Sequence, residues 1–200
     1  MTSLPSSPAA LRNRDPILAV LRQVLPASGV VLEIAAGTGE HAVHFAAALP
    51  GLDWRPTDPS QDALATIAAR RAQAALPNLA APLPLDAVRP EAWPVQAADA
   101  IVCINMIHIS PWSATEGLMT GAGRLLAAKG VLVLYGPYLE DEVETAASNL
   151  AFDASLKARD PSWGLRRREA VEALALRVGL ALDQRISMPA NNLCLVFRPR

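Results

Sequence analysis

The segment of residues 30–42 constrains the fold of this chain more than any other, because it reads as a strand, a tight loop and a helix in direct succession. An apolar run leads into the small-residue loop 35–39, and a helical pattern begins immediately after it. Gly37 and Gly39 allow a sharp turn and leave no Cβ between the backbone and a ligand. Backbone N–H groups in such a unit approach a nucleotide closely. The segment therefore predicts a nucleotide-binding loop.

Two carboxylates accompany this loop. Glu33 lies near the end of the preceding strand, where a carboxylate meets a cationic amino group. Asp58 ends the next apolar block, about twenty residues after Gly37, which is the spacing of an acid that accepts hydrogen bonds from ribose hydroxyls. The loop and its two acids therefore indicate a ligand that contains a ribose.

Two cofactors compete for this pattern. Gly37, Gly39 and Ala42 match the dinucleotide motif G-x-G-x-x-G/A, so a nicotinamide- or flavin-dependent oxidoreductase is one interpretation. Glu40 argues against it, because a carboxylate directly after the loop repels a pyrophosphate at the helix N-terminus, and Glu33 has no obvious partner in a dinucleotide. S-adenosylmethionine carries an ammonium, a sulfonium, a carboxylate and a ribose but no phosphate, and it suits the loop better. A turn without a ligand, or a non-catalytic cofactor-binding protein, remains a third interpretation.

The composition is that of one globular domain. The chain has 200 residues, of which 52% are hydrophobic and 18% are charged, so it is rich in core residues. Its formal net charge of −1 does not provide the basic surface that nucleic acid binding requires. The one basic cluster, residues 166–168, reads as the solvated start of a helix. We therefore expect a single domain over residues 1–200 and no nucleic acid partner.

Targeting and metal signals are absent from the sequence. No uncharged apolar run reaches the roughly eighteen residues that a membrane-spanning helix needs, and the first residues lack the pattern of a signal peptide. Cys103 and Cys194 fall in expected central strands as small buried residues, and no Cys/His cluster indicates a metal site. These features predict a cytoplasmic protein with no membrane partner, no metal ion and no disulfide framework.

Short β-type runs alternate with longer helical patterns, which is typical of βαβ units around a parallel sheet. Asp15 and Pro16 form the pattern of an N-cap followed by proline at the first helical position. Ser113 and Glu116 have the spacing of a capping box. The expected strands are 30–34, 52–56, 83–85, 100–105, 131–135, 182–187 and 193–197. The expected helices are 16–25, 40–49, 60–75, 113–126, 142–157 and 167–178.

The last twenty residues differ from the rest of the chain. The runs 182–187 and 193–197 are joined by only five turn-like residues, which is too short for a parallel crossover, so the two strands must form an antiparallel hairpin. The sequence thus predicts a Rossmann-like α/β fold: a seven-stranded, mostly parallel sheet with a C-terminal antiparallel hairpin and helices on both faces. A dinucleotide-dependent enzyme would usually need another βα unit and a second domain.

Several stretches resemble known proteins. The loop, the acid after the second strand, Asp86 and the C-terminal hairpin together resemble class I S-adenosylmethionine-dependent methyltransferases. Nearly the whole chain further resembles a family of small proteins of unknown function, the methyltransferase-like twenty-six family. The stretches that carry this closer resemblance are residues 7–18, 35–46, 104–112, 148–156, 159–166 and 188–193. The resemblance implies the fold and the cofactor, S-adenosylmethionine, but supplies no substrate.

The resemblance also implies a set of cofactor-binding residues. Asp86 and Ala87 follow the third strand, whose end meets the adenine in this class. His41 and Asn105 are expected near the methionine end of the cofactor. Ala35 departs from the class pattern, in which the first loop position is often glycine, but alanine is also small. The complete expected set is Glu33, Ala35, Gly37, Gly39, His41, Asp58, Asp86, Ala87 and Asn105.

Three residues are candidates for catalysis. The region after the fourth strand faces the transferred methyl group in this class, and here it contains His108. His108 is the best candidate for a general base, because its unperturbed pKa lies near neutrality, although a histidine that only hydrogen-bonds the loop fits equally well. Residues 136–179 are expected to form a helical insertion that covers the acceptor site, with Tyr138 and Asp153 as further catalytic candidates. We expect methyl transfer to a small acceptor by a monomer or homodimer, with an NAD(P)-dependent oxidoreductase as the alternative.

Overall fold

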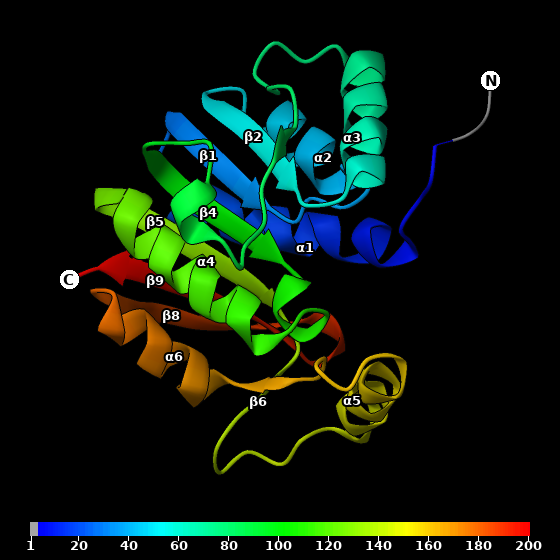
Figure 1. Ribbon diagram of the computed structural model, residues 1–200, viewed down its shortest axis with the longest axis vertical. Helices are drawn as coiled ribbons and strands as arrows, with labels where there is room; N and C mark the ends of the chain where they lie inside the picture. The colour runs from blue at the N-terminus through cyan, green and yellow to red at the C-terminus, as the bar shows by residue number, and fades with distance from the viewer. Residues whose placement is uncertain (1–3) are drawn as a thin grey trace.

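The computed structural model describes residues 4–200 and shows a central sheet with helices on both faces (Figure 1). Residues 1–3, which belong to the expected single domain, lie outside the described part. The sheet has seven strands in the order β3-β2-β1-β4-β5-β9-β8. Its strands are β1 (Gly29–Ile34), β2 (Leu52–Asp58), β3 (Leu83–Pro84), β4 (Ala98–Ile104), β5 (Leu126–Gly136), β8 (Leu180–Met188) and β9 (Asn192–Pro199). β9 is antiparallel to β5 and β8, and the other pairs of this sheet are parallel, which confirms the predicted α/β fold.

Six α-helices and three short 3-10 helices complete the described part of the chain. The α-helices are α1 (Pro8–Val24), α2 (Glu40–Ala48), α3 (Gln61–Ala74), α4 (Trp112–Leu125), α5 (Ala147–Arg159) and α6 (Arg168–Arg177). The 3-10 helices are η1 (Pro90–Ala92), η2 (Met106–His108) and η3 (Pro189–Asn191). None of the helices within residues 4–200 combines the length and the apolar character that crossing a membrane requires.

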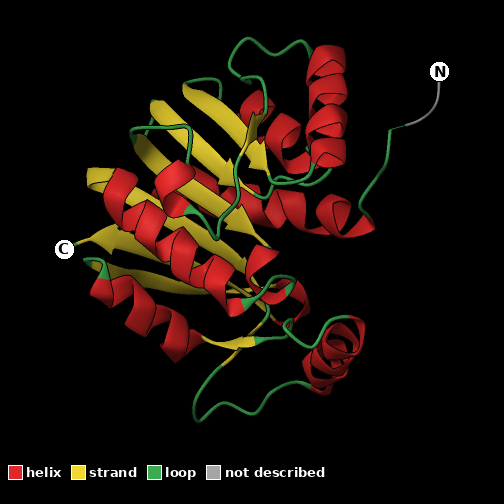
Figure 2. Ribbon diagram, in the orientation of Figure 1, coloured by secondary structure: helices red, strands yellow, loops and turns green. Residues whose placement is uncertain are grey.

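Alternating side chains of the central strands divide the core into two layers. In β5, Val131 and Val133 point to one face of the sheet, while Leu132 and Leu134 point to the other. The first face packs against α1 and α2, and the second packs against α4 and α6. Figure 2 shows helices on both sides of the strands. Because both faces are covered, the central strands are almost continuously apolar.

The first helix is longer than predicted. It begins at Pro8 and not at Pro16, because Ser7 is the N-cap residue and its side chain accepts a hydrogen bond from the Ala10 backbone N–H. Pro16 lies inside the helix, and the predicted cap at Asp15 is therefore wrong. The local pattern alone places the start of the helix at Pro16. Ser7, eight residues before Asp15, instead provides a hydrogen-bond acceptor for the free N–H groups of the first turn.

The predicted capping box at Ser113 and Glu116 is also wrong. Helix α4 begins one residue earlier, with Pro111 in the N-cap position and without a side-chain cap hydrogen bond. Ser113 thus lies inside the helix, where its hydroxyl cannot act as the cap. At the other end β5 follows α4 directly, because Leu126 already pairs with Ala98 of β4.

Residues 136–179 contain two different parts: β6 (Tyr138–Leu139), α5 and β7 (Arg166–Arg167) follow the carboxyl end of β5, whereas α6 packs on the face of the sheet beside α4. β6 pairs in parallel with β7, so the two short strands bracket α5. Helix α5 begins five residues later than predicted, since Glu142 has a left-handed φ of 60° that interrupts a helix. The Asn149 side-chain amide donates to the Asn191 carbonyl oxygen at 3.0 Å, which ties α5 to the tip of the C-terminal hairpin. Figure 1 shows α5 apart from the helices that cover the sheet.

Gly117 marks the closest approach between α4 and the segment after β3. A Cβ at this position would lie 1.9 Å from the carbonyl oxygen of Ala87 and 3.0 Å from its carbonyl carbon. Gly117→Ala should therefore lower the free energy of unfolding by about 1–3 kcal/mol in urea denaturation, because backbone has to move. Glu116→Ala, at an exposed position of the same helix, is the matched control and should change it by less than about 0.5 kcal/mol. Equal stability of the two variants would contradict this close contact.

Candidate active site

The loop between β1 and α2 lies at the carboxyl end of the sheet and has the predicted sharp turn. Ala35, Gly37 and Gly39 have left-handed φ values of 56°, 57° and 75°. No atom lies within 4 Å of a Cβ placed on Gly37, so this side of the loop is open. A Cβ on Gly39 would instead lie 3.1 Å from the Ile67 side chain. Gly39 is therefore needed for packing, whereas the space at Gly37 is available to a ligand.

Asp58 connects the end of β2 to this loop. Its Oδ2 accepts a hydrogen bond from the Gly37 backbone N–H at 2.9 Å, and its Oδ1 accepts one from the Ser60 N–H at 2.9 Å. The Thr57 carbonyl oxygen also accepts from the Ala36 N–H at 2.8 Å. Asp58 is buried, and the loop conformation depends on it. Asp58 therefore holds the loop in its conformation, and its spacing from the loop predicts a second role as a ribose contact.

Glu33 lies at the end of β1 and is only 2% exposed. Its Oε2 accepts a hydrogen bond from the Trp54 indole Nε1 at 2.6 Å. Burial raises the pKa of Glu33 to about 7, against the lowering effect of the Trp54 hydrogen bond and with a further increase from Asp58. A cation beside this carboxyl group would favour its ionised form.

Glu40, the first residue of α2, is bound by three donors. Its carboxylate accepts hydrogen bonds from Ser6 Oγ at 2.9 Å, the Ser7 N–H at 2.7 Å and Thr38 Oγ1 at 3.1 Å. Burial acts to raise the pKa of Glu40, but these hydrogen bonds and the charge of Arg70 outweigh it, so the pKa is lowered. The N-terminus of α2 therefore already holds a negative charge, which disfavours a pyrophosphate at this position.

His41 links three elements of the site. Its Nε2 lies 2.8 Å from Asn13 Oδ1 of α1, and its ring stacks on Phe45 with the centroids 5.4 Å apart. The Asn13 side chain also hydrogen-bonds Tyr135 at the end of β5. Burial lowers the pKa of His41 to about 4, so the imidazole is neutral near pH 7.

Asp86 and Ala87 follow β3, the strand next to β2. The Leu85 N–H donates to the Asp58 carbonyl oxygen at 3.2 Å, which places this segment beside Asp58. The exposed Asp86 carboxylate accepts from the Val88 N–H at 2.9 Å, and Ala87 is buried. Asp86 and Ala87, which are expected at the adenine, thus follow the strand next to the one that ends in Asp58, which is expected at the ribose.

A cavity of about 880 Å³ lies next to α2, because its lining residues Ser7 and Asn13 contact Glu40 and His41. Of the expected cofactor-binding residues, Asn105 lines it and the other eight do not. Asn105 contributes to its floor with a left-handed φ of 64°, and the Asn105 N–H donates to the Tyr135 carbonyl oxygen at 2.8 Å. The walls come from α1, η2, α5 and η3, and the lining residues are Ser7, Ala9, Arg12, Asn13, Pro16, Asn105, His108, Ile109, Tyr135, Pro137, Ser148, Asn149, Phe152, Pro189, Ala190, Asn191 and Asn192.

His108 lines this cavity although it is only 4% exposed. Its ring packs edge-on against Phe152 of α5, with the centroids 5.6 Å apart. The His108 carbonyl oxygen accepts a hydrogen bond from the Gly164 N–H at 3.1 Å. Burial lowers the pKa of His108 to about 4, and the charges of Arg166 and Arg159 lower it further. The imidazole is therefore neutral near pH 7, as a proton acceptor must be.

The other two catalytic candidates do not line this cavity. The Tyr138 hydroxyl is buried without a hydrogen-bond partner among the described residues, and burial raises its pKa well above the ordinary value. Asp153 Oδ1 accepts from the Leu165 N–H at 2.8 Å, and its Oδ2 forms an ion pair with Lys157. The structure thus places Tyr138 in the core, where it lines a smaller cavity of about 190 Å³, and Asp153 in a contact that joins α5 to the segment before β7.

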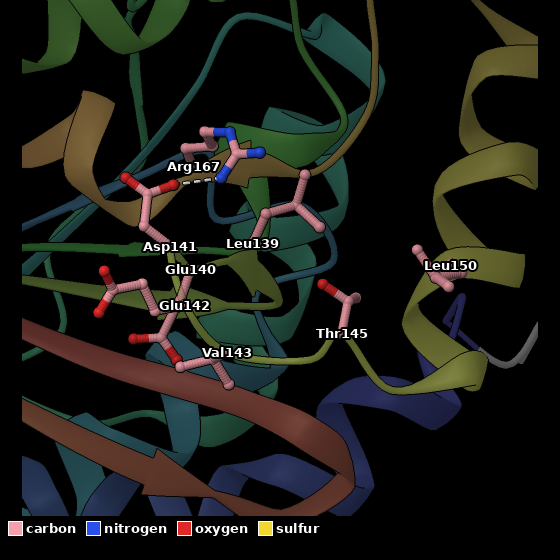
Figure 3. A pocket seen from close by; sticks show the side chains of 8 residues that line it. All are labelled: Leu139, Glu140, Asp141, Glu142, Val143, Thr145, Leu150 and Arg167. Carbon is pink, nitrogen blue, oxygen red and sulfur yellow. Dashed lines mark hydrogen bonds and ion pairs between the residues drawn. The ribbon is translucent and has the colours of Figure 1, made fainter.

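A second cavity, of about 560 Å³, lies over the loop after β6 and is drawn in Figure 3. Its lining contains Glu140, Asp141 and Glu142, and Asp141 forms an ion pair with Arg167. Neither a histidine nor an asparagine lines it, so it lacks the proton acceptor and the amides of the larger cavity. We assign the candidate active site to the larger cavity.

The sequence interpretation missed two contributors to the site. The hairpin tip, whose Asn191 and Asn192 fit a turn, also forms one wall of the cavity. Arg166 is not simply solvated: it donates to the carbonyl oxygens of Ser110 at 2.8 Å and Ile107 at 3.4 Å, which holds the segment that carries His108. Neither role has a local signal, because both contacts join residues that are more than forty positions apart.

Several solved structures that share this fold are methyltransferases. The chain aligns with the mitomycin 7-O-methyltransferase MmcR with a TM-score of 0.80 and 16% identity, over 96% of this chain and 54% of that one. An O-methyltransferase family protein from Burkholderia thailandensis aligns with a TM-score of 0.81 and 16% identity, over 96% and 57%. Human N-acetylserotonin methyltransferase in complex with S-adenosylmethionine aligns with a TM-score of 0.79 and 12% identity, over 96% and 52%. The chain thus shares the Rossmann-like α/β fold of these proteins and spans a little over half their length.

The family of the chain is defined at the sequence level. Residues 4–199 match the family described as protein of unknown function (DUF938). Because the match covers nearly the whole chain, the protein belongs to this family.

Two buried neutral histidines should make the folded state sensitive to acid. His41 and His108 each have a pKa of about 4 when folded, against 6.5 ordinarily, so the unfolded chain binds more protons between these values. Their stability contribution is complete above pH 6.5 and falls by about 1.4 kcal/mol per pH unit for each histidine as the pH drops toward 4. Glu33, with a pKa raised to about 7 from 4.5, acts in the opposite direction, so its contribution is lost as the pH rises through that window.

The variant His108→Gln removes one of these titrations. The free energy of unfolding, measured by urea denaturation, falls in both proteins when the pH is lowered from 6.5 to 5. The decrease should be about 2 kcal/mol smaller in His108→Gln than in the unaltered chain. His44→Gln is the control, because the His44 ring is more exposed and pairs with Asp15, and it should change the pH dependence less. An unchanged pH dependence in His108→Gln would show that His108 is not held neutral.

Proposed function

We propose that this protein transfers a methyl group from S-adenosylmethionine to a small-molecule acceptor. The observation that carries the proposal is the arrangement at the carboxyl end of the sheet. An open glycine loop lies with the buried carboxyl groups of Glu33 and Asp58 at the ends of β1 and β2. The helix after this loop is joined to the cavity that contains His108, because Asn13, which lines the cavity, contacts His41. The S-adenosylmethionine complex of human N-acetylserotonin methyltransferase, which shares the fold, supports the choice of cofactor. Membership of the methyltransferase-like twenty-six family, which the sequence resembles, is part of this proposal.

The ribose and adenine are assigned to the ends of β2 and β3. Asp58 accepts one hydrogen bond on each carboxylate oxygen, from Gly37 and Ser60, and each oxygen retains a lone pair for a ribose hydroxyl. Asp86 and Ala87, one strand further along the sheet, are assigned to the adenine. The exposed Asp86 carboxylate suits the adenine amino group as a hydrogen-bond donor.

The methionine end of the cofactor is assigned to the side of the loop that faces β4. Glu33 is buried there with a pKa of about 7, and an ammonium group beside it would hold it ionised. His41 and Asn105 complete this side, with the neutral imidazole fixed by its hydrogen bond to Asn13. Ala35 and Gly39 shape the loop through their left-handed backbone and need no side chain for binding.

The residues of the cavity supply positioning and a proton acceptor. S-adenosylmethionine, when bound, provides a methyl group on a cationic sulfur that is open to nucleophilic attack. The protein has to hold the acceptor against that methyl group and exclude water, which the walls formed by α5 and η3 do. His108 is neutral near pH 7 and takes the proton of a hydroxyl acceptor. An acceptor that is already deprotonated needs no base, and His108 then only orients it.

Calorimetric titration with S-adenosylhomocysteine and with NAD tests the cofactor. The unaltered chain should bind S-adenosylhomocysteine and not NAD, because the ionised Glu40 occupies the N-terminus of α2 that a pyrophosphate would need. Asp58→Ala should weaken the binding of S-adenosylhomocysteine by about 1.5–3 kcal/mol, since charged hydrogen bonds to the ribose are lost.

Asp53→Ala is the matched control for Asp58→Ala. Asp53 lies on the same strand but pairs at the surface with Arg55, and its removal should leave the affinity unchanged. Affinities are compared only at temperatures below the measured unfolding midpoints of both variants. Binding of NAD in place of S-adenosylhomocysteine, or unaltered binding by Asp58→Ala, would overturn the proposed cofactor site.

A further inference from the structure

The polar side chains of the large cavity differ in whether their hydrogen-bonding capacity is already used. Asn13 binds His41, Asn149 donates to the Asn191 carbonyl oxygen, and Asn192 donates to carbonyl oxygens within its own turn. Arg12, by contrast, is exposed at the edge of the cavity that it lines, and it makes no side-chain hydrogen bond or ion pair with another described residue. A guanidinium group with five N–H donors is thus available to a ligand there.

The permanent charge among the described residues that line the cavity is positive. Arg12 is the one permanently charged side chain among its described lining residues, and none of them is an aspartate or a glutamate. The pKa of His108 is lowered by burial and by the nearby charges of Arg166 and Arg159, and neighbouring cations include Arg14 beside His41. An anion is stabilised in such surroundings, whereas the ammonium of an amine is repelled.

The carboxylates of the site lie on the other side, at the glycine loop, and each is already bound. Glu33 accepts from Trp54, and Glu40 accepts from Ser6, Ser7 and Thr38. Asp58 accepts from the backbone N–H groups of the loop and of the start of α3. Negative charge is therefore concentrated where the cationic cofactor is proposed, and positive charge is concentrated where the acceptor is proposed.

Part of the remaining wall of the cavity is apolar. Ile109 and Phe152 are exposed large side chains, at 41% and 38%, and Phe152 packs against His108. Pro16, Pro137 and Pro189 add rigid apolar surface without side-chain donors. These walls suit a ligand with a compact apolar body, and Arg12 supplies the charged group for a polar substituent.

We propose that the methyl acceptor is a small, largely apolar carboxylic acid whose carboxylate is bound by Arg12, with its apolar body against Phe152. This inference rests on the proposed function. Arginine suits the role because its planar fork binds a carboxylate through two parallel N–H···O hydrogen bonds. Arg12 is a specificity residue in this proposal, and the bound carboxylate is the group that is recognised.

Ligand-observed NMR titrations of the full chain saturated with S-adenosylhomocysteine test the charge of the acceptor. The probes are benzoate, benzamide and benzylamine, which share an aromatic ring and differ in the charge of the substituent. Benzoate should bind at least tenfold more tightly than benzamide, and benzylamine should not compete. Arg12→Gln should abolish the preference for benzoate, and Phe152→Ala should weaken benzoate and benzamide alike. Arg22→Gln, at an exposed position in the last turn of the same helix, is the control and should keep the preference.

S-adenosylhomocysteine also carries a carboxylate that Arg12 could bind. A second titration distinguishes binding of this carboxylate from binding of the acceptor's carboxylate. Arg12→Gln should bind S-adenosylhomocysteine and methylthioadenosine, which lacks the amino acid end, within twofold of the unaltered chain. A selective loss for S-adenosylhomocysteine would assign Arg12 to the cofactor and overturn the proposed acceptor. Equal binding of benzoate and benzamide by the unaltered chain, or an undiminished preference in Arg12→Gln, would overturn it as well. Failure of the unaltered chain to bind S-adenosylhomocysteine would instead contradict the proposed function.

Discussion

The hydrogen bond from the Gly37 backbone N–H to the Asp58 carboxylate is the contact on which the rest of the site depends. It joins the loop after β1 to the end of β2, and the Asp58 carbonyl oxygen in turn accepts from Leu85 after β3. Three neighbouring parallel strands therefore end in a fixed relation to one another. The left-handed backbone of Ala35 is unfavourable for a residue with a Cβ, and it persists because the surrounding hydrogen bonds determine it.

The electrostatic division of the site follows from this arrangement. Buried acids surround the glycine loop and are satisfied by donors from the indole of Trp54, the loop backbone and the chain before α1. Arginines surround the cavity, and the two histidines near it are held neutral by burial. The acidic half around the glycine loop fits a cationic cofactor. The half that contains the cavity fits an acceptor that is negatively charged or neutral. Burial strengthens the effect of the acids Glu33 and Asp58, since charges interact more strongly where water is excluded, whereas Arg12 is exposed.

The strands and the loop could be predicted because their signals are local. Apolar runs identified the strands of the sheet within a few residues, and Gly37 and Gly39 have the backbone for which glycine is preferred. The start of α1 and the cap of α4 were mispredicted, because several residues could act as the N-cap and packing selected among them. Tyr138 and Asp153 were predicted because polar and aromatic residues are frequent in the segment after β5. Neither lines the larger cavity: the Tyr138 hydroxyl is buried, and Asp153 binds the Leu165 N–H and Lys157.

The sequence by itself determined the α/β fold class, the order of strands and helices, and the residues of the glycine loop with its two acids. Each of these depends on periodicity or on spacing within one βα unit. Only the tertiary structure decided which distant segments enclose the cavity: the start of α1, η2, α5 and the hairpin tip. It also decided the burial and neutrality of His108 and the availability of Arg12. The physical reason is that burial and charge environment are set by contacts between segments far apart in the chain, and no local pattern records those contacts.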